Sequence, residues 1–171
     1  MATSTSLPEG APAPREALLA GVAAQLDAID EIVGYARSRI QVFDTDLGWG
    51  GWSRATRIDA LGRFLRGGRT VRLDIIVHDT RWLEASSGRL IGVLRQYPHA
   101  VTMYRTGREA AAAMDPLVIV DRAHCLHRFH IDQPRAALIV AMPGAVKSLA
   151  ARFDEIWATG EPGLSSTTLG L

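Results

Sequence analysis

Residues 114–157, MDPLVIVDRAHCLHRFHIDQPRAALIVAMPGAVKSLAARFDEIW, show the order of elements in this chain most clearly. Runs of apolar and β-branched residues bounded by turn residues predict short strands. The expected strands are 117–120, 124–131 and 136–141. The first ends on Asp121, Pro134 marks the break before the third, and Pro143 suits the first turn of a long closing helix.

Upstream of this stretch, helical and strand patterns alternate. Apolar residues at three- and four-residue steps predict helices at 15–39, 53–66 and 87–96, and apolar runs predict strands at 40–43, 70–77 and 100–105. Such alternation requires crossover connections, whereas the short later connections favour antiparallel neighbours. We therefore expect an α/β fold with a mixed sheet, largely parallel with antiparallel additions, and helices on both faces.

The domain organisation follows from length and composition. Residues 1–14 are rich in small and polar residues and are expected to be disordered. Residues 15–171 are long enough for one domain with its own core.

Composition limits the classes of function. The net charge of +1 predicts no global field for an anionic membrane, and it makes nucleic acid an unexpected partner. All basic residues except Lys147 are arginine, which fits either a coding bias or selection for phosphate contacts. The single cysteine, Cys125, excludes an internal disulfide. Neither a membrane span nor a secretory signal is recognisable, which favours a cytoplasmic protein.

Several segments resemble those of a phospholipase-D-like domain in their order along the chain. They are IVGYARSRIQVF (32–43), LGRFLRGGRTVRLDIIV (61–77) and the stretch from 114 onward. The ending FDEIWATGEPGLSSTTLGL (153–171) resembles that of an uncharacterised bacterial family with this fold. The resemblance implies a phospholipase-D-like α/β domain over residues 15–171.

The superfamily's catalytic motif, His-x-Lys-x-x-x-x-Asp, is degenerate in this chain. Asp121 falls on the motif's aspartate, but Met114 and Pro116 stand at its histidine and lysine. Methionine offers no nucleophile and proline no cation, so the superfamily's phosphodiester chemistry is not expected. Asp121 is then a remnant that caps a strand turn. Superfamily members with one motif pair to assemble two half-sites, so the resemblance also implies a homodimer.

Polar residues follow the first two strands of the alternating region. Asp44 and Asp46 follow one strand, and His78 and Asp79 follow the next. Open α/β sheets bind ligands at the carboxyl ends of parallel strands, so these residues are candidate ligand-binding residues. Trp49 is expected near the same edge. Aspartates after strands are also ordinary turn formers, and that alternative remains open.

Further candidates are one arginine and three histidines. Arg105 ends the third strand, is a candidate for the same ligand site, and is an expected ion-pair partner for Asp74. Strand alternation places His124 and His130 on one face and His127 on the other, which does not favour a metal site. No cofactor is expected.

Three functions remain open. The first is a non-catalytic binding or regulatory module with an unknown protein or small-molecule partner. The second is a phosphodiesterase or nuclease in which His124 or His130 replaces the lost histidine. The third is a structural protein-interaction domain with Trp157 and the following tail at the interface.

Overall fold

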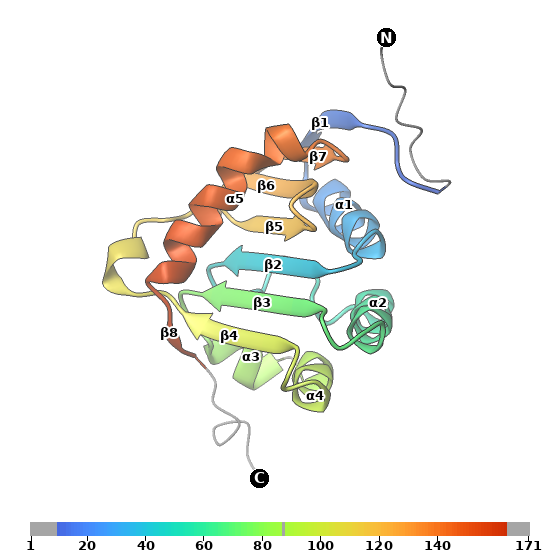
Figure 1. The fold of residues 1–171 in the computed structure, drawn as a ribbon. Helices are drawn as coiled ribbons and strands as arrows, with labels where there is room; N and C mark the ends of the chain where they lie inside the picture. The colour runs from blue at the N-terminus through green and yellow to red at the C-terminus, as the bar shows by residue number, and fades with distance from the viewer. Residues whose placement is uncertain (1–9, 87, 164–171) are drawn as a thin grey trace.

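The computed structural model of the chain describes residues 10–86 and 88–163. A mixed eight-stranded sheet crosses the middle of the domain in the order β1-β7-β6-β5-β2-β3-β4-β8 (Figure 1). The strands are β1 (Arg15–Ala20), β2 (Arg39–Asp44), β3 (Arg72–Val77), β4 (Val101–Arg105), β5 (Leu117–Val120), β6 (His124–His130), β7 (Gln133–Val140) and β8 (Glu161–Pro162). Of the segments predicted to be disordered or a tail, residues 1–9 and 164–171 lie outside the described part of the chain.

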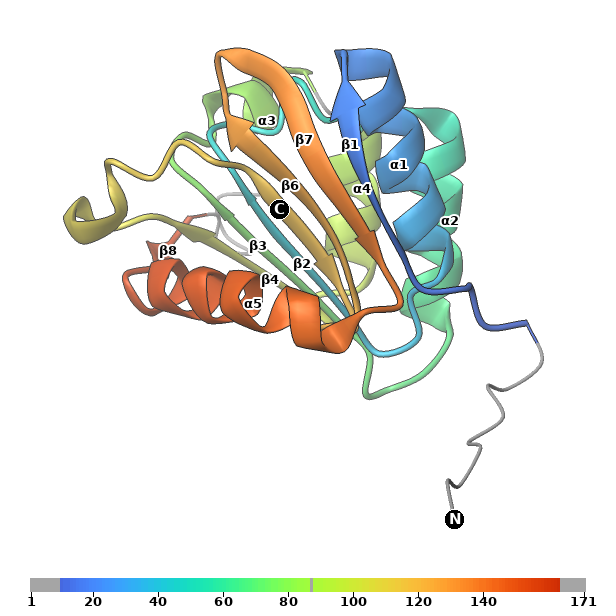
Figure 2. The ribbon, with the colours of Figure 1, turned by 90° about the horizontal axis from the view of Figure 1, so that it is seen from above.

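Helices cover both faces of the sheet, as predicted. The helices are α1 (Val22–Gly34), α2 (Ala55–Arg66), α3 (Arg81–Ser86), α4 (Gly88–Gln96) and α5 (Pro143–Ala158), with a 3-10 turn at Arg108–Ala110. Seen from above, α1, α2 and α4 lie on one face, and α5 lies alone on the other (Figure 2). Side chains alternate along each strand, so Val42 packs into the core under α1, α2 and α4, whereas Phe43 packs under α5.

The sheet is mostly antiparallel, and the expectation of a largely parallel sheet was wrong. Only the crossovers through α2 and through α3–α4 join parallel neighbours, β2 with β3 and β3 with β4. The pairings of β5 with β2, β5 with β6, β6 with β7, β7 with β1 and β4 with β8 are antiparallel. The physical reason is that α1 leads from β1 to β2, which are not neighbours, so this helix adds no parallel pair.

The prediction of a helix from residue 15 was also wrong at its start. Residues Arg15–Ala20 form edge strand β1, paired with β7 from Arg15↔Val140 to Ala20↔Arg135. Gly21 then turns the chain with a φ of 90°, a conformation that favours glycine, before α1 begins. Pro134, expected to separate two strands, instead lies inside β7 near its start.

Candidate functional site

The carboxyl ends of β2 and β3 meet at one edge of the sheet. The backbone N–H of Asp79 donates to the Thr45 carbonyl at 2.9 Å, which ties the two strand exits together. A hollow of about 520 Å³ opens there. It is lined by Thr45, Asp46, His78, Asp79, Thr106, Gly107, Arg108, Ala111 and Met114. Asp46, His78 and Asp79 therefore line the same hollow, and their role as ligand-binding residues stays a prediction.

His78 is held at both ring nitrogens. Nε2 lies 2.6 Å from the carbonyl oxygen of Ala113, so this nitrogen carries a hydrogen and donates it. Nδ1 lies 2.6 Å from the hydroxyl of Thr106. In the neutral ring Nδ1 accepts from that hydroxyl, and in the charged ring it donates to it. In both cases the imidazole is a crosslink between β3 and the segment before β5, without a free lone pair for nucleophilic attack.

The two carboxylates of this hollow are also engaged. Asp79 forms an ion pair with Arg81, whose hydrogen bonds lower the pKa of Asp79 to about 2. Asp46 Oδ1 accepts the backbone N–H of Gly48 at 2.8 Å. Arg108, in contrast, is exposed and makes no ion pair with any residue in the described part of the chain. Arg108 is thus a free cation on the lining.

Asp44 is buried and Trp49 is half-buried, and neither belongs to the lining of this hollow. Asp44 is 1% exposed, and burial raises its pKa to about 7. The backbone N–H of Thr45 donates to it at 2.6 Å. The nearby indole N–H of Trp49 opposes this rise in the pKa of Asp44, although the two groups do not form an ordinary hydrogen bond. The Arg128 guanidinium lies 4.5 Å from the centre of the Trp49 ring.

The residues expected at the superfamily's motif positions do not lie together. Met114, expected at the position of the motif's histidine, lines the hollow described above and also a second, smaller one. Asp121 lies at the opposite end of β5 and accepts four hydrogen bonds. The donors are Arg37 N at 2.8 Å, Ser38 N at 2.9 Å, Ser38 Oγ at 2.8 Å and Arg39 N at 2.8 Å. Asp121 therefore fixes the loop that enters β2.

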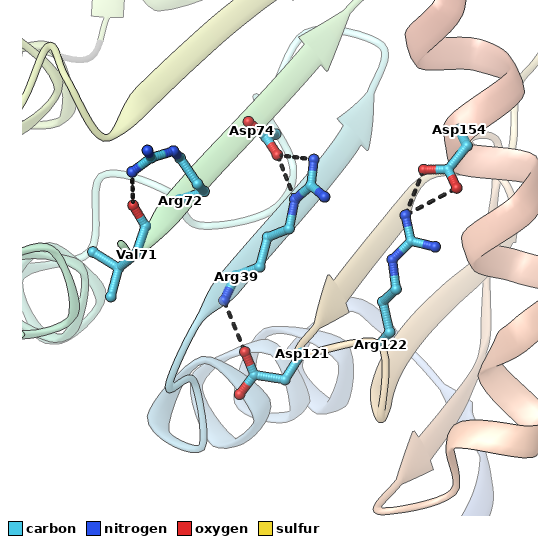
Figure 3. A network of polar contacts seen from close by, with 7 residues as sticks. All are labelled: Arg39, Val71, Arg72, Asp74, Asp121, Arg122 and Asp154. Carbon is cyan, nitrogen blue, oxygen red and sulfur yellow. Dashed lines mark hydrogen bonds and ion pairs between the residues drawn. The ribbon is translucent and has the colours of Figure 1, made fainter. Parts of the chain in front are cut away.

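The buried carboxylate of β3 has a different partner from the one expected. Asp74 pairs with Arg39, whose Nε and Nη2 lie 2.7 and 2.6 Å from Oδ2 (Figure 3). The expected partner, Arg105, instead lies 3.7 Å from Glu161 of β8. Arg39 reaches Asp74 because β2 and β3 are parallel and in register, a pairing that the sequence does not specify.

The second hollow contains two of the three histidines. It measures about 290 Å³ and is lined by Ala112, Met114, Asp115, His127, Phe129 and His130. His127 Nε2 lies 3.1 Å from Asp115 Oδ2, and Arg152 of α5 holds the same carboxylate through Nε at 2.6 Å. Burial raises the pKa of Asp115, but His127 and Arg152 outweigh it and lower that pKa to about 2. Asp115 is therefore an ionised group that orients His127.

His130 does not lie on the face of β6 that strand alternation predicts, whereas His124 lies on the face opposite to His127, as predicted. A register shift between Arg128 and His130 lets His130 share the hollow of His127. His130 Nδ1 accepts the Asp132 N–H at 3.2 Å. His124 packs on Tyr35 of α1, with ring centres 5.2 Å apart, and burial lowers its pKa. In the described part of the chain, no three His, Cys, Asp or Glu side chains come together in a way that could hold a metal ion.

The pairing of His127, Asp115 and Arg152 was not predicted from the sequence. One signal was available, because Asp115 stands between Met114 and Pro116, the residues expected at the positions of the motif's histidine and lysine. The pairing itself depends on the β5–β6 register, in which Leu117 faces His127, and on the docking of α5.

Solved structures share this fold. Nuc from Salmonella typhimurium, a phospholipase D family member, aligns with a TM-score of 0.54 at 15% identity over 88% of this chain and all of its own. NucT from Helicobacter pylori gives 0.57 at 13% identity, covering 89% of this chain and 100% of the other. The domain therefore has a phospholipase-D-like α/β fold.

The chain belongs to the domain of unknown function family DUF7931, which matches residues 22–167. No curated protein matches the sequence.

A third similar structure is TrmBL2, an archaeal chromatin protein with a novel mode of DNA binding. It aligns with a TM-score of 0.63 at 14% identity over 94% of this chain, which spans 56% of the TrmBL2 chain. A protein of this fold that binds DNA stands against the expectation that nucleic acid is not a partner, although the likeness itself establishes the fold alone.

No helix in the described ranges has the length and apolar character of a bilayer span.

Proposed function

We propose that this protein is a non-catalytic binding module whose ligand occupies the hollow at the carboxyl ends of β2 and β3. The observation that carries the proposal is the chemistry of two lining residues. Met114 offers no nucleophile at the position of the superfamily's histidine, and His78 has both ring nitrogens engaged. Neither of these two lining residues can then act as a nucleophile or as a histidine general base, so the site is suited to holding a molecule.

The lining indicates the class of ligand. Arg108 is an unpaired cation, Asp46 retains a second carboxylate oxygen, and Ala111 and Met114 supply apolar contact. Arginine binds carboxylates and phosphates through two parallel hydrogen bonds. The ligand that fits is a small molecule with one anionic group and an apolar part, of a size suited to a hollow of about 520 Å³.

The test is saturation-transfer NMR with AMP, phenyl phosphate and indole-3-acetate as probes, each of which has one anionic group and an apolar part. We expect signal transfer to at least one probe, lost in Arg108→Gln and retained in Arg89→Gln. Arg89 is a matched control because it is exposed on α4, likewise without an ion pair among the described residues. Transfer that persists in Arg108→Gln, or is absent with every probe, would contradict the proposal.

A second function is favoured by one observation, the orientation of His127 by Asp115. A carboxylate that holds one imidazole nitrogen is the arrangement that activates the other nitrogen as a base. His130 lines the same hollow, so a phosphodiesterase with relocated histidines remains the alternative.

Turnover distinguishes the two functions. Bis(p-nitrophenyl) phosphate and labelled oligonucleotides are incubated with the protein, with and without divalent metal. The binding module predicts no turnover above that of His127→Ala and His130→Ala. Turnover that is lost in His127→Ala, and unchanged in His99→Ala outside the hollow, would establish the phosphodiesterase and refute the proposal.

The structural-interaction alternative depends on Trp157. This side chain lies against Tyr104 and Phe153, with ring centres 4.5 and 5.7 Å apart. These contacts give Trp157 a role within its own chain, which supports the first proposal over this one.

A further inference from the structure

Five exposed arginines gather at the amino ends of β2 and β3, opposite the two hollows described above. They are Arg37, Arg63, Arg66, Arg69 and Arg72, named here the arginine surface. Arg37 precedes β2, two of them lie in the last turn of α2, and the other two follow α2 up to the first residue of β3.

The tertiary structure brings these segments together. Arg39 and Arg72 are register partners at the start of the parallel pair, and the Arg72 backbone N–H donates to the Ser38 carbonyl at 2.9 Å. Arg37 and Arg63 line one hollow of about 340 Å³ between the ends of α1 and α2. The surface is therefore continuous across two loops and the end of a helix.

The charges on this surface are not neutralised by the protein. In residues 10–86 and 88–163, none of the five guanidinium groups lies within ion-pair distance of a carboxylate. Two of the neighbouring carboxylates are already engaged, because Asp74 holds Arg39 and Asp121 holds backbone N–H groups (Figure 3). Asp59, one turn before Arg63, is exposed and makes no ion pair with it.

Arg72 is positioned to present its charge outward. Its Nη1 donates to the carbonyl oxygens of Arg69 at 3.2 Å and Val71 at 2.8 Å. Figure 3 shows the side chain directed away from Asp74 and Arg39. The remaining guanidinium hydrogens are free to donate to a ligand.

The dipole of helix α2 accounts for only two of these five arginines. The macrodipole favours cations in the last turn of α2, where Arg63 and Arg66 lie. Arg37, Arg69 and Arg72 lie outside that helix and gain nothing from its dipole. Five unpaired like charges so close together repel one another, so their grouping calls for an external anion.

We propose that the arginine surface binds the phosphate backbone of a nucleic acid. Guanidinium groups bind phosphates through paired hydrogen bonds, and a row of them matches a row of phosphates. All large apolar side chains with high exposure in the described residues, Leu18, Val22 and Phe129, lie elsewhere. An anionic membrane would be expected to need such side chains beside the charges, which favours nucleic acid.

Binding of this kind is insensitive to base sequence and sensitive to salt. No base-reading group is required, and each phosphate contact releases counterions. The whole-chain charge of +1 conceals the surface because acidic residues elsewhere cancel it in the sum.

The test is fluorescence anisotropy with labelled 20-nucleotide single-stranded DNA and a 20-base-pair duplex at 50, 100 and 200 mM KCl. The triple variant Arg37→Gln, Arg63→Gln, Arg66→Gln removes three exposed charges. Its control, Arg89→Gln, Arg135→Gln, Lys147→Gln, removes three exposed charges elsewhere, so both carry the same net charge. Thermal melts establish that both variants are folded.

We expect the first variant to bind at least roughly tenfold more weakly at 100 mM KCl, with a shallower salt dependence, and the control to stay within about threefold of the original. Equal losses in both variants would show a non-local charge effect and overturn the proposal. So would the absence of binding at 50 mM KCl, or binding to phosphatidylserine vesicles without binding to either DNA.

Discussion

At the residue scale, the hydrogen bonds of Asp121 give this side chain a structural role. Four hydrogen bonds from residues 37–39 converge on it. We expect Asp121→Ala to lower the free energy of unfolding by roughly 2–4 kcal/mol, because several backbone donors lose their acceptor. Asp121→Asn should cost less, since the amide keeps one acceptor oxygen. Urea unfolding measures both.

The control for Asp121 is Asp154→Asn, which breaks an exposed ion pair with Arg122 at 2.7 Å (Figure 3). Its expected cost is below about 1 kcal/mol. Burial raises the pKa of Asp121, but the hydrogen bonds from Arg39, Ser38 and Arg37 have the larger combined effect, so the pKa lies below its ordinary value. A depressed pKa stabilises the fold above the ordinary carboxyl pKa and loses that effect in acid. The gap between the original protein and Asp121→Asn should thus shrink below about pH 4, and a constant gap would contradict this role.

Asp44 has the opposite pKa shift and gives the opposite pH dependence. Its pKa is raised from 3.8 to about 7 by burial, so the folded state holds a proton that the unfolded state has lost between these values. Stability should therefore fall as pH rises from 4 to 7. Asp44→Asn removes this titration and should raise the free energy of unfolding at pH 8 by roughly 2–4 kcal/mol.

Unfolding curves at pH 4.5 and 8 measure the effect of Asp44→Asn. The gain should fall to about 1 kcal/mol or less at the lower pH, where the unfolded state has only partly lost the proton that the folded state keeps. Asp46 and Arg128 also act on this region. The charge of Asp46 adds to the raised pKa of Asp44, whereas burial lowers the pKa of Arg128 and the charge of Asp44 opposes that shift. A variant that is less stable at both pH values would show instead that Asp44 is the counter-charge of Arg128.

At the scale of elements, Arg57 joins α2 to α1 and to the loop before α2. It is fully buried and donates to Asp30 at 2.8 Å, to the Leu26 carbonyl at 2.8 Å and to the Gly50 carbonyl. We expect Arg57→Met to lower the free energy of unfolding by roughly 3–5 kcal/mol, because buried acceptors lose their donor. Chemical denaturation measures the loss.

Arg54 on the same helical segment is the matched control. It is 41% exposed and lies 3.0 Å from Asp30, so Arg54→Met should cost less than about 1 kcal/mol. Similar small costs for both variants would show that Arg57 does not hold the two helices together.

At the scale of the whole molecule, we predict a homodimer through the surface around Met114. Phe129 lies beside it in the second hollow and is 39% exposed, an apolar group suited to an interface. Equilibrium sedimentation should give twice the 18.5 kDa chain mass, and Phe129→Ser should give the monomer. Leu18→Ser, on the outer edge strand, should leave the dimer intact. A single 18.5 kDa species at high concentration would refute the prediction.

Local patterns in the sequence were sufficient for much of the fold. Buried runs such as Leu117–Val120 must be central strands, and the three-to-four spacing of α2 and α5 must be helical, because each pattern has its own period. The edge strand β1 was not predictable in this way. Its residues fit a helix equally well, and only hydrogen bonding to β7, more than a hundred residues away, selects the strand.

The sequence by itself determined the α/β class and the helices on both faces of the sheet. These depend on residue type and local spacing. Only the tertiary structure decided that the sheet is mostly antiparallel, that Asp115 holds His127, and that five arginines share one surface. Each of these depends on strand register and helix docking, which join residues far apart in the chain and leave no local pattern.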